Sequence, residues 1–120
     1  MGTEIRPSSK WRIMSLGAGS ILADGSEQVI LYRDGGSPAL VHGYLDLANM
    51  QAGDQITLTQ YARVRPGGPW RAYGQEGYAD AQALPLIYIT KKPKDYGLRV
   101  TIRQTGGAYR NYDFEFFEES

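Results

Sequence analysis

The last quarter of the chain alternates apolar and polar residues so regularly that it constrains the whole fold. Every second side chain of residues 97–103 is apolar, and the same alternation returns in residues 112–117 after Gly106-Gly107. A period of two predicts two strands that each bury one face. We expect these strands to pair with each other as a hairpin closed by the glycine turn.

The apolar faces also predict the register of this hairpin. A three- or five-residue loop sets Val100 opposite Phe114 and, on the other face, Arg99 opposite Glu115. A two-residue loop would set apolar side chains against polar ones. The predicted core-facing side chains are Leu98, Val100, Ile102, Tyr112, Phe114 and Phe116.

The rest of the chain has the pattern of short strands separated by Gly, Pro and Asp turns. The further predicted strands span residues 10–16 (continued by 20–23 after a bend), 28–33, 39–46, 55–64, 70–78 and 84–90. Seven or eight such strands, with no helix of three turns, predict an all-β fold, a single antiparallel β-sandwich or jelly roll. Residues 1–9 are polar and contain Pro7-Ser8-Ser9, so we expect an N-terminal arm followed by one domain at 10–120.

Charge and cysteine content argue against several classes of function. The 120 residues carry 13 basic and 13 acidic side chains, a balance that favours neither nucleic acid nor an anionic membrane as partner. The one basic cluster, Lys91, Lys92 and Lys94, is predicted to be a solvated loop. The chain has no cysteine, hence no disulfide and no thiolate chemistry.

Targeting signals are also missing from the sequence pattern. No apolar run approaches the roughly 20 residues that cross a bilayer, and the first residues lack the apolar core of a signal peptide. These features predict a product made in the cytoplasm. Nine arginines against four lysines is a bias found in some thermophilic proteins.

Candidate catalytic residues are few and poorly placed. His42 lies within a predicted strand and has no nucleophile pattern near it, so a packed or surface histidine is favoured over a catalytic triad or a zinc ligand. Asp113 and Glu115 share one face of the last strand, roughly 7 Å apart, a spacing that would suit a glycosidase pair. A cross-strand ladder with Arg99 and Arg103 is the favoured interpretation. We predict no enzyme, no metal and no cofactor.

Aromatic and arginine side chains gather around the predicted turn at residues 66–68. Trp, Tyr and Arg are enriched at protein interfaces, and flat rings also stack on sugars. The candidate binding residues are Arg6, Tyr61, Arg63, Trp70, Arg71, Tyr73 and Tyr78. The alternative interpretation is that half of these residues are core side chains of adjacent strands.

Surplus apolar surface points to association with other proteins. The strand at 28–33 is apolar on both faces, and Phe117 adds to Phe116, which together exceed what one small sandwich buries. We expect a homo-oligomer or docking on a larger body. The alternative is a carbohydrate-binding module whose stacking platform is Trp70, Tyr73 and Tyr78.

Three stretches of the sequence, residues 23–28, 43–54 and 96–107, carry a family resemblance. Together they resemble small uncharacterised proteins encoded among the virion genes of tailed viruses and proviruses, over most of the chain after residue 20. The resemblance implies a virion component such as a capsid decoration or cement protein. Its expected partners are further copies of itself, in a homo-oligomer such as a trimer, and a major capsid protein or other virion protein. It brings no catalytic motif.

Overall fold

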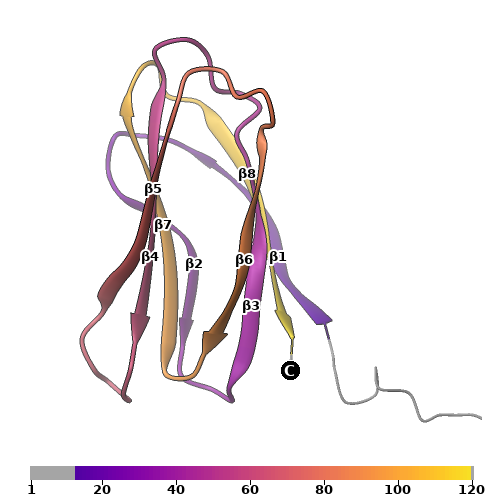
Figure 1. Cartoon of the computed structure of the whole chain (residues 1–120), viewed down its shortest axis with the longest axis vertical. Coiled ribbons are helices and arrows are strands. Elements are labelled where there is room, and N and C mark those ends of the chain that lie inside the picture. The colour runs from indigo at the N-terminus through magenta and orange to yellow at the C-terminus, as the bar shows by residue number, and fades with distance from the viewer. Residues whose placement is uncertain (1–12, 120) are drawn as a thin grey trace, which may run out of the picture.

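The computed structural model describes residues 13–119, which form eight strands and no helix (Figure 1). The strands are β1 (Ile13–Leu22), β2 (Gln28–Asp34), β3 (Ala39–Asp46), β4 (Gln55–Arg63), β5 (Arg71–Ala79), β6 (Leu86–Lys94), β7 (Gly97–Gly106) and β8 (Asn111–Glu119). The predicted all-β sandwich is therefore confirmed. The predicted N-terminal arm at 1–9 lies outside the described residues.

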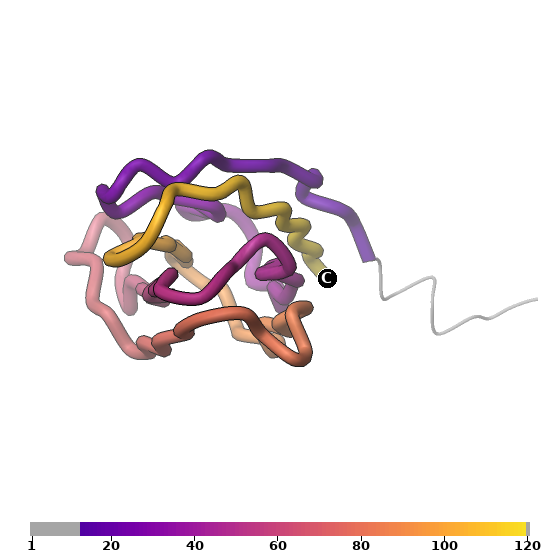
Figure 2. The backbone as a smooth tube through the Cα atoms, turned by 90° about the horizontal axis from the view of Figure 1, so that it is seen from above, coloured from indigo at the N-terminus to yellow at the C-terminus, as the bar shows by residue number. Residues whose placement is uncertain are grey.

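The eight strands form two antiparallel sheets of four that face each other (Figures 1 and 2). Sheet A has the order β1-β8-β3-β6, and sheet B has the order β2-β7-β4-β5. The pairs β1–β8, β2–β7, β3–β6 and β4–β5 nest inside one another. Such nesting describes one long hairpin, with its tip between β4 and β5, rolled into two layers, which is the arrangement of a jelly roll.

The core lies between the two sheets and comes from alternate residues of both. Sheet A contributes Val41, Leu45 and Phe116, while sheet B contributes Leu58 and Val100, all buried. At one end of the sandwich, Arg33 of β2 reaches Glu118 of β8, with 3.0 Å between Nη2 and Oε1. Apolar burial between the layers is thus the main force that holds the two sheets together.

The predicted pairing of the last two strands is wrong, although their predicted inward faces are correct. β7 lies in sheet B between β2 and β4, and β8 lies in sheet A between β1 and β3. The two strands face each other across the core, so the Arg99–Glu115 ladder does not form. The buried Gln104 stabilises the crossover turn: its amide donates to Gly106 O and Ala108 O, and its oxygen accepts from Arg110 N and Tyr112 Oη.

Two β-bulges explain departures from simple alternation. In β2 the register against β7 shifts between Val29 and Leu31, so Ile30 and Leu31 are both buried while Val29 is exposed. The double-sided apolar strand is thus partly core. In β1 the register shifts between Ser15 and Gly17, which carries the strand through the predicted bend.

The lysine cluster belongs to a strand, which corrects the prediction of a solvated loop. β6 continues through Pro93 to Lys94, as an edge strand tolerates proline. Lys94 is buried and donates to Gly35 O and Ser37 O at 2.8 and 2.6 Å, which satisfies backbone carbonyls of the β2–β3 turn. Val64, the last residue of the strand predicted at 55–64, lies beyond the end of β4 and is exposed.

Candidate functional site

The outer face of sheet B carries three of the predicted binding residues, stacked together. The guanidinium of Arg63 lies 4.3 Å from the ring centre of Trp70, and that of Arg99 lies 4.3 Å from Tyr61 and 5.1 Å from Trp70. Tyr32 packs on Trp70 with ring centres 5.6 Å apart. Cation–π contacts of this kind stabilise by about 0.5–2 kcal/mol each.

Two acidic side chains, Asp34 and Glu27, bind polar groups of this stack. Asp34 binds Arg63 at 2.6 Å, and Glu27 accepts hydrogen bonds from Thr101 Oγ1 and from the Tyr61 hydroxyl. The hydrogen bond from Thr101, with that from Tyr61, lowers the pKa of Glu27, and the bond to Glu27 raises the pKa of Tyr61. Asp34 and Glu27 thus pair with Arg63 Nη1, Tyr61 and Thr101, whereas Nε of Arg63 and Nε of Arg99 are buried without a hydrogen-bond partner among the described residues.

Gly97 lies directly against the side chains of Trp70 and Arg63 in this stack. A Cβ at Gly97 would lie 2.7 Å from Cη2 of Trp70 and 3.3 Å from Cδ of Arg63. We expect Gly97→Ala to push the indole outward, to lower the free energy of unfolding by about 1–2 kcal/mol, and to shift Trp70 fluorescence to the red. The measurement uses a Trp11→Phe background, in which Trp70 is the one remaining tryptophan. Gly74→Ala, whose Cβ meets ordinary contacts at 3.7 Å, should leave the emission unchanged.

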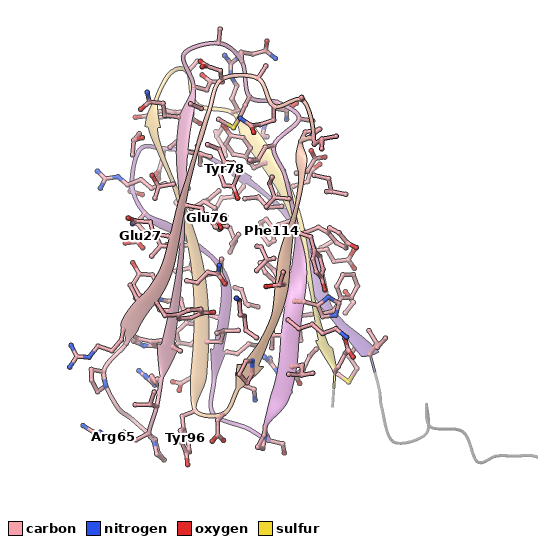
Figure 3. The ribbon with its side chains drawn as sticks, viewed as in Figure 1. Glu27, Arg65, Glu76, Tyr78, Tyr96 and Phe114 are labelled. Atoms are coloured by element: carbon pink, nitrogen blue, oxygen red, sulfur yellow. The ribbon has the colours of Figure 1, made fainter. Side chains whose placement is uncertain are left out.

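The remaining predicted binding residues are not part of this surface. Tyr78 packs against the core and donates to Glu76 at 2.6 Å, and both lie on the side of β5 that faces sheet A (Figure 3). Tyr73 donates to Gln60 and lines a hollow with Ala62 and Leu98 at the edge between the sheets. Burial raises the pKa of Tyr73 to about 12. Trp70, Tyr73 and Tyr78 therefore do not form the predicted sugar-stacking platform.

The last two candidates are Arg71 and Arg6. Arg71 is exposed at the start of β5, and Arg6 lies outside the described residues.

The outer face of sheet A exposes more large apolar side chains than the outer face of sheet B. Its side chains form rows across the strands, which the pairing of β1, β8, β3 and β6 defines. The rows are Ser20–Asp113–Asp46–Leu86, Ala18–Glu115–Tyr44–Tyr88, Ser15–Phe117–His42 and Ile13–Glu119–Leu40–Pro93. The sequence search missed this surface because residues from four distant segments make it.

An aromatic cluster occupies the middle of this face. Tyr88 packs on Tyr44 and on His42 with ring centres 5.2 and 5.7 Å apart, and Phe117 packs on His42 at 5.4 Å. His42 Nδ1 lies 3.0 Å from the Tyr88 hydroxyl, and Nε2 lies 3.0 Å from Glu119. His42 is thus a packed surface histidine, as predicted.

Beside the cluster lies a groove of about 520 Å³, which we call the acidic groove. It is lined by Ala18, Gly19, Tyr44, Asp46, Leu86, Asp113, Phe114 and Glu115. The small residues of β1 leave it hollow, and a Cβ at Gly19 would lie 2.8 Å from Cζ of Phe114. Its volume is that of an ordinary ligand site.

The three carboxylates of the acidic groove have no basic partner within residues 13–119. The ion pairs found there are Arg33–Glu118, His42–Glu119, Arg63–Asp34, Lys91–Glu119 and Arg110–Asp54. Within the groove, Glu115 accepts from Ser15 Oγ at 2.8 Å and Asp46 from Ala48 N at 2.9 Å. The groove therefore presents net negative charge beside exposed rings.

Comparison with protein-family models, with curated proteins and with solved structures found no match to this chain. In the described part of the chain, no three His, Asp or Glu side chains are grouped so as to hold a metal ion. Residues 13–119 also contain no helix long and apolar enough to span a membrane.

Proposed function

We propose that this chain is a non-enzymatic structural protein that works by self-association and by docking on a larger protein shell, and that the outer face of sheet A is its contact surface. The observation that supports this proposal is the number of large apolar side chains exposed on that face, which is greater than on the outer face of sheet B. Leu86 is 58% exposed and Tyr88 43% exposed, and Ile13, Leu22 and Tyr44 are exposed on the same side. A contiguous apolar surface of this kind is a mark of protein interfaces.

The chemistry of the two outer faces supports the choice of sheet A over sheet B. On sheet B, arginine, aromatic and acidic side chains bind one another. On sheet A, rings and leucine face solvent beside carboxylates that lack basic partners. A stable interface buries about 800 Å² per partner, and one repeated many times in a lattice gains strength from multivalency.

The proposed setting is the virion of a tailed virus. The support is the sequence resemblance of residues 23–28, 43–54 and 96–107, together with the jelly-roll strand order, which viral capsid domains share with other classes of protein. The genes that flank this one test the setting. We expect them to encode virion proteins; neighbours that all encode metabolic enzymes would contradict it.

Self-association is tested by light scattering over a wide range of concentrations. We expect the mass of the unmodified protein to rise above 13.3 kDa, and the double variant Leu86→Ser/Tyr88→Ser to remain monomeric because it removes apolar area from the contact face. Tyr32→Ser, which removes an exposed tyrosine from the outer face of sheet B, is the matched control and should associate normally. An unmodified protein that is monomeric at every concentration would overturn the self-association half of the proposal.

A further inference from the structure

The acidic groove breaks a rule that stable sheets follow. Asp46 and Asp113 lie directly opposite each other on β3 and β8, and like charges in that position destabilise a sheet. Glu115 adds a third carboxylate two residues along β8. Opposed carboxylates destabilise the sheet and do not help folding, and departures of this kind are expected at binding surfaces.

We propose that the acidic groove binds residues 1–12 of a second copy of this chain. This inference rests on the proposed self-association and names the segment that the contact face receives. The groove supplies negative charge with an apolar wall made by Tyr44 and Leu86. Its occupant should therefore carry positive charge and at least one large apolar side chain.

Residues 1–12 have this composition. They contain Arg6, Lys10 and Arg12 against one acidic residue, Glu4, together with Trp11 as an apolar anchor. Arginine and tryptophan are the side chains that most often dominate binding energy at interfaces. Arginine also pairs with carboxylates through two hydrogen bonds. The basic side chains therefore match the negative charge of the groove, and the indole matches its apolar wall.

The reach of the segment favours a second copy over the same chain. Ile13 lies opposite Glu119, whereas Ala18 of the groove is five residues further along β1, a distance of about 17 Å. The nearest turn-forming residues before Ile13 are Pro7-Ser8-Ser9. A reversal there leaves six residues, about 20 Å of chain. About 10 Å of this only retraces residues 10–12, so the segment extends about 10 Å past Ile13 and does not reach Ala18. A neighbouring copy is not subject to this limit.

Cysteine cross-linking tests the contact directly, because the chain has no cysteine of its own. Ser20 is exposed on the outer face of β1 beside the groove. Two full-length single variants, Ser8→Cys and Ser20→Cys, are mixed and oxidised. We expect a disulfide-linked dimer of the two different chains. Val29→Cys, at an exposed position of β2 in sheet B, replaces Ser20→Cys as the control and should give far less dimer.

Charge reversal tests the chemistry of the same contact. We expect Arg6→Glu/Lys10→Glu/Arg12→Glu to weaken association about tenfold, and Asp113→Lys/Glu115→Lys to do the same. Mixing the two charge-reversed variants should restore association between them. A yield of disulfide between the Ser8→Cys and Ser20→Cys chains no greater than with the control, or an absence of rescue, would overturn the inference. If association still depends on Leu86 and Tyr88 in that case, the proposed function stands and the groove has another occupant.

Discussion

A single methyl group added at Gly43 is expected to destabilise the protein strongly. Gly43 lies on β3 opposite Phe116 of β8. A Cβ there would clash with the backbone oxygen of Glu115 and would lie 2.5 Å from Cδ1 of Phe116. β3 is a central strand, so the backbone atom cannot move without disturbing the β3–β8 pairing. We expect Gly43→Ala to lower the free energy of unfolding by about 3 kcal/mol.

The control for this prediction is another glycine of a strand. At Gly77 of β5 a Cβ would meet nothing within 4 Å, and β5 is an edge strand. Gly77→Ala should change the free energy of unfolding by less than about 0.5 kcal/mol. Urea denaturation followed by circular dichroism measures both variants. A Gly43→Ala protein as stable as Gly77→Ala would show that β3 and β8 do not approach as closely as the structure indicates.

Alternation in the sequence predicts which side chains face the core, but it does not predict which strand lies alongside. Val100 and Phe116 face inward as expected. Two strands joined by a short turn can pair edge to edge or lie in opposite layers, and either arrangement buries the same apolar residues. Here the crossover turn is bound by the amide of the buried Gln104. No periodic pattern reveals such a contact.

The candidate site was harder to predict than the fold for a related reason. Tyr61, Arg63 and Trp70 were singled out because they are close in sequence, and the structure does bring them together. The acidic groove instead combines Ala18, Asp46, Leu86 and Asp113, from four strands. Their proximity follows from the strand order of sheet A, which the sequence alone did not define. Asp113 and Glu115 were noticed, but their expected arginine partners belong to the other sheet.

Loss of the buried carboxylate of Asp54 is the second change expected to have a large effect. Asp54 is 1% exposed and joins two loops. Its oxygens accept from Gln51 N at 2.8 Å, Ala108 N at 3.1 Å and Arg110 Nε at 2.9 Å. In Asp54→Asn, the amide NH₂ would face donors in either orientation, and Arg110 would lose its counter-charge. We expect the free energy of unfolding at pH 7 to fall by about 3 kcal/mol.

The effect of Asp54→Asn should also depend on pH, in a direction that the pKa of Asp54 determines. The hydrogen bond from Arg110 lowers this pKa in the folded protein, against burial, which raises it. A carboxyl whose pKa is lower when folded stabilises the protein above its unfolded pKa of about 3.9, and the stabilisation is lost as pH falls through the folded value. The difference in the free energy of unfolding between the unmodified protein and Asp54→Asn should therefore stay constant from pH 7 to 5 and shrink below about pH 4.

Asp95→Asn, at an exposed turn residue, is the control and should show little difference in the free energy of unfolding at any pH. A difference that does not shrink in acid would mean that packing around Asp54, and not its charge, joins the two loops.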